Sequence, residues 1–455
     1  MHLLIIGGGT AAISAARDAV ARGMEVTLVH EGLPLGGCCL NVGCVPSKYL
    51  IRAAEQVHQS QWQRFPGIVP KGADIDTRAL LKDQRALVAA LRKRNYEDPL
   101  PELAGLRMVK GWGALRDARS VEVNGETITG DAVLIATGSR TATPPIPGLE
   151  TVDLLTNENL FDSDVLPDSV LVLGGGYIAL EMAQMMQRMG TRVTLLQRSG
   201  HVLSKQPAEL GEAIADFFRD EGMSVYCDTE IKEIRRNGDE IHASFSHGGE
   251  VKTCRAAAVF AALGRAGNTE TLNLDGVGVE THGNGFIRVN EAYETSLPGV
   301  YAAGDVLGGH LLVYTASFEA EQIVARLAGE SARGLTETEI PWVVFTDPQI
   351  AGVGLDAAAA RAEGFEVEEA VLPVNRWPRF STAHESRGFL KLYRDPTTDL
   401  LLGARAICPE GGDLTTELAW IRNKKIPLRE VAASLAPYLT LSEGIAKCAA
   451  NFYTS

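Results

Sequence analysis

Two glycine-rich turns, each directly after a short apolar run, constrain the fold of this 455-residue chain more than any other feature. The first turn, Gly7-x-Gly9-x-x-Ala12, follows the apolar residues 3–6 and opens a helical pattern that runs to Arg22. Such a turn allows a tight bend, a close approach of the backbone to a pyrophosphate, and packing of the helix on the strand. The helix N-terminus adds amide donors and a dipole that favour phosphate. The sequence therefore predicts a βαβ unit that binds a dinucleotide.

A second turn of the same kind, Gly174-x-Gly176-x-x-Ala179, follows the apolar residues 170–173 and also opens a helix. A single glycine-rich turn can arise for packing reasons alone, whereas two in one chain are a much more specific signal. Together the two turns predict two nucleotide cofactors.

In each unit, the strand after the turn should end in the residue that contacts the nucleotide ribose. In the first unit His30 holds the expected acidic place and Glu31 comes one later, and of the two we favour Glu31. In the second unit a glutamine and Arg198 replace the acid, with His201 and Lys205 close behind. An arginine accommodates a 2′-phosphate, so Arg198 favours NADPH over NADH. The alternative is a solvated arginine at a strand end.

Seven cysteines stand at positions 38, 39, 44, 227, 254, 408 and 448, and only the first three form a cluster. An odd, scattered set is not the disulfide framework of a secreted protein. On an ideal helix Cys39 and Cys44 would point roughly 140° apart. Gly43 and Pro46, however, permit a distorted turn that would bring the two sulfurs together. The residues alone leave open a redox dithiol or a pair of buried small side chains.

Chain length predicts about three domains, and the sequence pattern shows where they change. Residues 144–148 are proline-rich and typical of a linker, and mixed strands and helices begin near Thr336. We expect a first nucleotide domain over 1–147, a second over 148–265, a return to the first over 266–335, and a third domain over 336–455. In the returning segment Asp305 ends a strand, where it would accept a hydrogen bond from a ribityl hydroxyl or cap a helix.

Composition excludes several classes of function. A hydrophobic fraction of 45% and a charged fraction of 22% are those of an ordinary globular protein with a sizeable core. The formal net charge of −14 disfavours nucleic acid as a partner. No apolar run approaches the ~20 residues of a membrane helix, and the opening strand leaves no room for a targeting peptide. We expect a cytoplasmic protein without a membrane partner.

The segment between Gly36 and Lys48, with the pattern Gly-Gly-x-Cys-x-Asn-x-Gly-Cys-x-Pro-Ser-Lys, resembles the active-site signature of the class I pyridine nucleotide–disulfide oxidoreductases. Glutathione reductase and mercuric reductase belong to that family, and the resemblance covers essentially the whole chain. It implies an α/β fold like that of glutathione reductase, with two Rossmann-like domains for FAD and NAD(P)H and a C-terminal α+β dimerisation domain. It also implies a homodimer in which the partner's C-terminal domain completes the active site.

The resemblance assigns a role to each member of the reactive cluster. Cys44 would lie nearer the flavin as the charge-transfer thiolate, and Cys39 would attack the substrate, because the thiolate is the reactive form. Lys48 would lie beside the flavin and pair with Glu181, and Tyr177 would form an aromatic lid over the nicotinamide pocket.

The same resemblance implies the remaining cofactor contacts. The helix near Val313 would direct its positive end at the flavin. The implied FAD contacts are Gly7, Gly9, Thr10, Ala11, Ala12, Glu31, Gly37, Cys38, Lys48, Gly113, Thr137, Gly138, Asp305 and Val313. The implied NAD(P)H contacts are Gly174, Gly176, Tyr177, Ile178, Glu181, Arg198 and Gly264.

Within the family the chain resembles the mercuric reductases. Members that handle disulfides carry a C-terminal His–Glu pair as acid and base, but this chain has no histidine after His384. Tyr438 stands at about that place with Glu443 after it, and Tyr96 matches a second tyrosine that flanks the metal site in mercuric reductases. A half-buried helix aromatic is the other interpretation of Tyr96. The N-terminal metal-binding domain and the C-terminal Cys-Cys tail of many mercuric reductases are missing.

These features predict an NADPH-driven reductase of a metal thiolate, with no structural metal. Soft thiolates bind Hg(II) strongly, so the ion would be held transiently at Cys39 and Cys44. Two alternatives remain. One is a reductase of a small disulfide or reactive oxidant without the usual His–Glu pair, and the other is a flavin-containing redox sensor.

Overall fold

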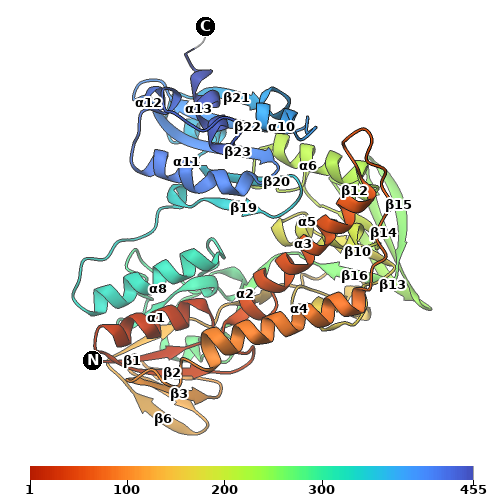
Figure 1. Ribbon diagram of the computed structural model, residues 1–455. Coiled ribbons are helices and arrows are strands. Elements are labelled where there is room, and N and C mark those ends of the chain that lie inside the picture. The colour runs from red at the N-terminus through yellow and green to blue at the C-terminus, as the bar shows by residue number, and fades with distance from the viewer. Residues whose placement is uncertain (454–455) are drawn as a thin grey trace.

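The computed structural model describes residues 1–453. Thr454 and Ser455, at the end where the sequence lacks a Cys-Cys tail, lie outside the described residues. Three regions, each built on a five-stranded sheet, surround the middle of the molecule (Figure 1). Helices α3 (Cys44–Gln61) and α4 (Thr77–Arg92) run side by side from the first region to the second. The segment that carries the three clustered cysteines therefore lies between the two predicted nucleotide units.

The first sheet is parallel, has the strand order β18-β7-β1-β2-β3, and contains the first glycine-rich turn. Its strands are β1 (His2–Ile6), β2 (Glu25–His30), β3 (Leu106–Lys110), β7 (Ala132–Ile135) and β18 (Val300–Ala302). Helices α1 (Thr10–Ala21) and α8 (Val313–Leu327) cover one face. The other face packs against a small antiparallel sheet of β4 (Ala114–Asp117), β5 (Ser120–Val123) and β6 (Glu126–Thr129). Leu3, Leu4, Ile5 and Ile6 are buried because both faces are covered.

The second sheet is also parallel, with the order β12-β11-β10-β16-β9, and contains the second glycine-rich turn. Its strands are β9 (Leu154–Leu155), β10 (Ser169–Leu173), β11 (Arg192–Leu196), β12 (Ser224–Tyr226) and β16 (Ala258–Ala261). Helices α5 (Tyr177–Arg188) and α6 (Ala208–Asp220) cover one face. An antiparallel sheet of β13 (Glu230–Asn237), β14 (Glu240–His247) and β15 (Glu250–Ala256) covers the other. The two units thus repeat one layered plan.

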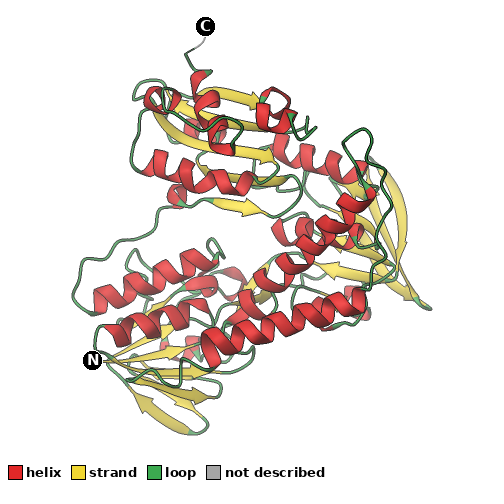
Figure 2. Cartoon of the chain, in the orientation of Figure 1, coloured by secondary structure: helices red, strands yellow, loops and turns green. Residues whose placement is uncertain are grey.

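The C-terminal region is antiparallel, with the order β19-β20-β23-β22-β21, and has helices beside its sheet (Figure 2). Its strands are β19 (Trp342–Val344), β20 (Gln349–Gly354), β21 (Glu368–Pro373), β22 (Phe389–Asp395) and β23 (Leu400–Cys408). The helices are α9 (Ala357–Ala362), α10 (Pro378–Ser381), α11 (Leu414–Asn423), α12 (Leu428–Ala432) and α13 (Leu441–Ala450). Residues of α11, α12 and α13 pack on the sheet in one core cluster, which makes this region α+β.

Short elements connect the regions. Strand β17 (Arg265–Gly267) pairs with β8 (Ser139–Thr141) and crosses the domain boundary predicted at residue 265, so the boundaries themselves stay a prediction. The remaining helices are α2 (Gly37–Asn41) and α7 (Leu274–Val277). No helix among residues 1–453 is long and apolar enough to cross a membrane.

Candidate active site

One cavity of about 1980 Å³ reaches from the first nucleotide unit through the second to the C-terminal sheet. Nearly all of the predicted cofactor contacts line it. They are Gly7, Gly9, Thr10, Ala11, Glu31, Gly37, Cys38, Lys48, Gly113, Thr137, Gly138, Asp305, Val313, Gly174, Gly176, Tyr177, Ile178, Glu181, Arg198 and Gly264. Cys39 and Cys44 line the same cavity. Ala12 is the exception among the cofactor contacts, because its side chain is buried under the turn.

The break between α2 and α3 brings the two cysteines together. Helix α2 ends at Asn41, and α3 begins at Cys44 after a break at Val42 and Gly43. A Cβ on Gly43 would lie 2.9 Å from the Cys38 carbonyl oxygen, so glycine lets the helices approach this closely. The Cys39 and Cys44 side chains are hydrogen-bonded to each other, and all seven cysteines, which lie within residues 1–453, are free thiols.

The two thiols differ in acidity. The hydrogen bond from Cys39 and the nearby positive charge of Lys48 lower the pKa of Cys44 to about 7. The pKa of Cys39 is raised, because its proton is held in that hydrogen bond and because the thiol is buried. Cys44 is therefore the group that carries negative charge near neutral pH, while Cys39 stays protonated.

Lys48 is held by a buried carboxylate from the second unit. Its Nζ lies 2.5 Å from one oxygen of Glu181, whose side chain is only 8% exposed. The other carboxylate oxygen accepts the backbone N–H of Phe345 at 3.0 Å. The Lys48 ammonium also lies 4.8 Å from the centre of the Phe345 ring. The ion pair thus connects α3, α5 and the segment after β19.

The first glycine-rich turn forms a cradle that fits FAD. Gly7 has φ +139°, and a Cβ there would lie 2.1 Å from the Ala136 carbonyl oxygen. A Cβ on Gly37 would lie 2.7 Å from the Gly9 Cα. No side chain caps the N-terminus of α1, so its amides remain available to phosphate. Side chains at these glycines would close the turn and fill the space beside it.

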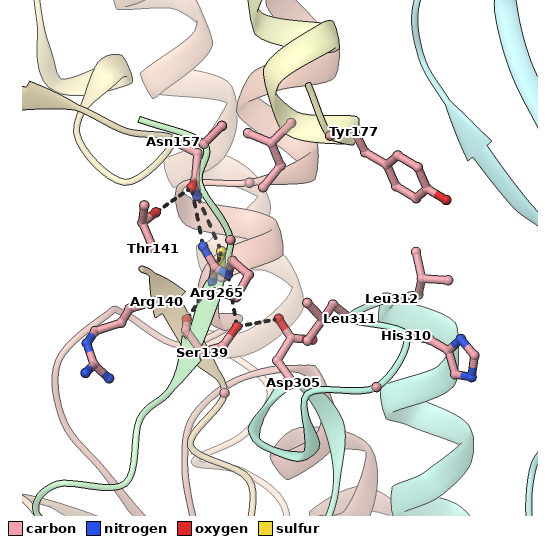
Figure 3. A pocket seen from close by; sticks show the side chains of 18 of the residues that line it. Ser139, Arg140, Thr141, Asn157, Tyr177, Arg265, Asp305, His310, Leu311 and Leu312 are labelled. Carbon is pink, nitrogen blue, oxygen red and sulfur yellow. Dashed lines mark hydrogen bonds between the residues drawn. The ribbon is translucent and has the colours of Figure 1, made fainter. Parts of the chain in front are cut away.

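Other residues at the flavin end agree with that fit. Asp305 does not cap a helix, which was the alternative interpretation, since Ala303 holds the N-cap place. The Asp305 carboxylate accepts a hydrogen bond from the Ser139 hydroxyl at 3.1 Å. His30 and Glu31 both line the cavity, so the ribose contact stays a prediction. Helix α8 directs its N-terminus at the same space (Figure 3).

The second glycine-rich turn has matching geometry for a nicotinamide dinucleotide. Gly174 has φ +105°, and a Cβ there would lie 2.4 Å from the Ala262 carbonyl oxygen. No side chain caps the N-terminus of α5. Arg198 and Lys205 line the cavity, and neither has an ion-pair partner within residues 1–453. His201 does not line it, because its Nδ1 donates to the Val202 carbonyl at 2.8 Å.

We expect Arg198→Ala to raise the Kd for NADPH about 10- to 100-fold, the value of one or two charge-assisted hydrogen bonds to the 2′-phosphate. The Kd for NADH should change less than twofold. Calorimetric titration with each dinucleotide measures the effect. Arg192→Ala is the matched control, because Arg192 is exposed at the other end of β11 and does not line the cavity. An equal loss for NADPH and NADH would contradict the assigned role of Arg198.

A buried carboxyl lies beneath the flavin end of the cavity. Burial raises the pKa of Glu319 from 4.5 to about 7, although the Gly304 N–H donates to its carboxylate. A raised carboxyl pKa destabilises the folded state as pH rises. The penalty is absent below pH 4.5, where both states are protonated, and is complete above about pH 7.

We therefore expect Glu319→Gln to stabilise the protein at pH 8, by at most about 3 kcal/mol, and to have little effect near pH 4.5. The glutamine oxygen can still accept from Gly304. Thermal melts at several pH values measure the change. Glu321→Gln, an exposed position on the same helix, is the control. A pH-independent shift in melting temperature would contradict the prediction.

One protomer does not bring the predicted tyrosines to the cysteines. Tyr96 lies in a π-helical turn, where it packs on Gly36, and outside the cavity. Tyr438 is 69% exposed and lies 5.7 Å from the Lys447 ammonium. Glu443 pairs with Lys447 at 2.8 Å and caps the Leu439 N–H. The described protomer therefore leaves the assigned roles of these three residues as predictions.

Sequence reasoning missed a polar cluster between the flavin end and the cysteine loop (Figure 3). Arg265 donates to the Ser139 carbonyl at 2.6 Å and lies 3.8 Å from the Cys38 sulfur. Asn157 also lies 3.8 Å from that sulfur and donates to the Val42 carbonyl at 3.1 Å. Burial raises the pKa of Cys38 to about 11, so it stays a neutral thiol. Arg265 and Cys38 are 227 positions apart in the chain, so no local pattern indicated this contact.

Within residues 1–453, no cluster of three or more histidine, cysteine or acidic side chains has the geometry to hold a metal ion. The cavity instead joins two dinucleotide cradles to a dithiol. This combination defines the class of flavin-dependent disulfide oxidoreductases.

Comparison with known proteins identifies the family. The model of the pyridine nucleotide-disulphide oxidoreductases matches residues 1–320, and that of their dimerisation domain matches residues 340–449. The chain belongs to this family, which confirms the predicted fold class, and it is an oxidoreductase that uses FAD and NAD(P)H. The dimerisation domain supports a homodimer.

Individual relatives and solved structures show which proteins of the family the chain is similar to. The chain is 36% identical to mercuric reductase of Staphylococcus aureus, covering 99% of this chain and 82% of that protein. It is 37% identical to mercuric reductase of Streptomyces lividans, covering 100% and 96%. The HOCl-induced flavoprotein disulfide reductase RclA from Escherichia coli superposes with a TM-score of 0.87 at 25% identity, over 99% of both chains. LpdA from Mycobacterium tuberculosis superposes with a TM-score of 0.88 at 25% sequence identity, also over 99% of both chains. The predicted resemblance to mercuric reductases is confirmed.

Proposed function

We propose that this protein is an NADPH-driven reductase of thiol-bound Hg(II), in which Cys39 and Cys44 bind the ion and supply its electrons. The observation that carries the proposal is the pair of interacting thiols, of unequal pKa, in a cavity shared with both dinucleotide cradles. Full-length identity of 36–37% to mercuric reductases supports the choice of substrate. The lack of the histidine of the C-terminal His–Glu pair supports it too, because a thiolate that leaves a metal ion needs no imidazole acid to protonate it.

The dithiol binds the ion by ligand exchange. Cys44 attacks first, and not Cys39 as the family resemblance implied, since its lowered pKa makes Cys44 the thiolate near neutral pH. Cys39 then gives its proton to one departing carrier thiolate, so one carrier leaves as a thiol and the other as a thiolate while the two cysteines take their places on Hg(II). Reduction of the ion to Hg(0) takes two electrons from the two thiolates, which join as the Cys39–Cys44 disulfide. Bound FAD supplies the chemistry that returns two electrons from NADPH to that disulfide.

Lys48 and Glu181 assist reopening of the disulfide. When it is reduced, one sulfur must leave as an anion, and a thiol of low pKa leaves faster. The Lys48 ammonium stabilises negative charge on Cys44, and Glu181 fixes the position of Lys48. Cys39 takes up a proton from solvent and stays the neutral thiol of the pair, in line with its raised pKa.

The tyrosines belong to this proposal through the homodimer. Tyr438 and Glu443 of the partner subunit would enter the space above Cys39, and Tyr96 would lie at its edge. The exposed position of Tyr438 on the C-terminal region supports a role between subunits. We propose the cytoplasm as the compartment, because a reducing environment keeps these thiols free.

A second candidate is a reductase of reactive oxidants or small disulfides. The fold match to RclA, whose name describes an HOCl-induced disulfide reductase, favours it. A substrate panel separates the two candidates. NADPH consumption and mercury vapour are measured with Hg(II) in excess thiol, then with glutathione disulfide and with hypochlorite-derived oxidants. The proposal requires Hg(II)-dependent consumption with stoichiometric Hg(0). Turnover with disulfides or oxidants but none with Hg(II) would replace it with the second candidate.

A further inference from the structure

An aromatic stack joins the nicotinamide lid to the C-terminal sheet. The rings of Tyr177, at the start of α5, and Trp342, at the start of β19, are stacked 5.8 Å apart and 15° from parallel. Both side chains line the cavity. In Figure 3 the Tyr177 ring points away from Arg265 and Asp305, which lie at the flavin end. The lid therefore rests on another region of the molecule instead of covering the flavin end.

Trp342 is itself held in place by two features of the C-terminal sheet. A Cβ on Gly352, its partner across the sheet, would lie 2.7 Å from the indole ring, so only glycine leaves room for this ring position. The Arg405 guanidinium lies 5.6 Å from the centre of the ring. Arg405 is buried, and it donates to the carbonyls of Val353 and Ala404 at 3.1 and 2.9 Å. The platform under the tyrosine is rigid.

Gln206 closes the arrangement on its other side. Its side-chain oxygen accepts from Arg405 at 2.9 Å, and Gln206 lines the cavity together with Tyr177. Gln206 lies after β11, in the second nucleotide unit. The tyrosine is thus held at its ring face by Trp342, which Arg405 and Gln206 support.

We infer that Trp342, supported by Arg405 and Gln206, is a latch that holds the Tyr177 lid away from the nicotinamide pocket and keeps the pocket open for NADPH. Without the latch, the ring turns into the empty pocket, and the dinucleotide must displace it. Trp342 is then a positioning residue, which acts on NADPH affinity only through Tyr177. This inference rests on the family's use of NAD(P)H and is independent of the substrate proposed above.

A double-mutant cycle on the FAD-loaded enzyme tests the latch, with the Kd for NADP⁺ measured by calorimetry. We expect Trp342→Ala to raise that Kd about 3- to 10-fold, the value of one aromatic pair. In the Tyr177→Ala background the same change should have less than a twofold effect. Trp342→Phe should restore most of the affinity, because phenylalanine can still stack. Trp62→Ala is the matched control, since Trp62 is 64% exposed and outside the cavity.

Kinetics of the same variants give a second readout. With ferricyanide as the electron acceptor, the KM for NADPH should rise in Trp342→Ala while kcat changes less than twofold. An unchanged or lower Kd in Trp342→Ala would overturn the latch. An equal rise in Kd with and without Tyr177 would also overturn it, because Trp342 would then act directly. FAD content and melting temperature identify a variant that has misfolded, and for such a variant Gln206→Ala takes its place, with the same expected rise.

Discussion

Cys44→Ser is expected to lower kcat/KM for thiol-bound Hg(II) by roughly a thousandfold or more, because it removes both a metal ligand and one electron-carrying sulfur. A serine hydroxyl cannot ionise near pH 7, form a disulfide or bind a soft ion. The change is nearly isosteric, so FAD content should stay at the wild-type level. Steady-state NADPH oxidation with Hg(II) in excess thiol measures the loss.

One further variant tests the same prediction, and another is its control. Cys39→Ser should cause a comparable loss, since neither thiol alone can complete the disulfide. Cys254→Ser is the matched control, because Cys254 is a half-buried thiol on β15 that does not line the cavity. If Cys44→Ser kept more than about a tenth of the wild-type rate, electrons would reach the ion by another route.

Lys48→Met should have the second-largest effect, on both stability and thiol acidity. It leaves the Glu181 carboxylate buried and unpaired, a situation that costs about 3–5 kcal/mol when both partners are buried. Because the Lys48 side chain is 32% exposed, solvent reduces the expected loss to about 2 kcal/mol. Denaturant unfolding of the FAD-loaded protein measures it. The double variant Lys48→Met/Glu181→Gln should recover most of the loss, since it removes the stranded charge.

The same substitution should raise the pKa of Cys44, because the lysine charge is one of the influences that lower it. A thiol whose folded pKa lies near 7, below its ordinary 9.0, stabilises the reduced fold above pH 9, and that stabilisation is lost as pH falls through 7. In Lys48→Met the pKa of folded Cys44 lies closer to 9.0. The pH range over which the stabilisation changes therefore becomes narrower, because its lower limit rises. Thiolate absorbance against pH in a Cys39→Ser background reports the shift. An unchanged titration would show that Lys48 has no influence on Cys44.

The architecture could be predicted from the sequence wherever the conformation of one short backbone segment determined it. Gly7 and Gly174 sit where a Cβ would strike the neighbouring strand, so each turn marked its βαβ unit. Other element boundaries depend on details of the local backbone. Helix α3 begins at Cys44, inside the signature segment, because Pro46 in a first helical turn lacks only an N–H that would be unpaired there anyway. Helix α4 ends at Arg92, and the chain continues as a π turn that contains Tyr96.

The site was predicted where one motif held the residues together, and not where the contact crosses regions. Cys39, Cys44 and Lys48 come from one segment, and its resemblance to the family signature indicated that they lie together. Contacts between distant residues, such as Arg265 with Cys38 or Trp342 with Tyr177, carry no local signal, because tertiary packing alone creates them. Positions such as Tyr438, whose proposed role lies across the subunit interface, need a second protomer to be placed.

Anaerobic reduction of the FAD-loaded enzyme by NADPH, followed by alkylation and mass-spectrometric mapping of the labelled thiols, tests the electron path most directly. The oxidised protein is expected to leave Cys39 and Cys44 unlabelled, and two equivalents of NADPH should expose both and no other cysteine. Addition of thiol-bound Hg(II) should then protect both again while Hg(0) appears. Labelling of Cys39 and Cys44 that is the same before and after NADPH would contradict a relay through these two sulfurs.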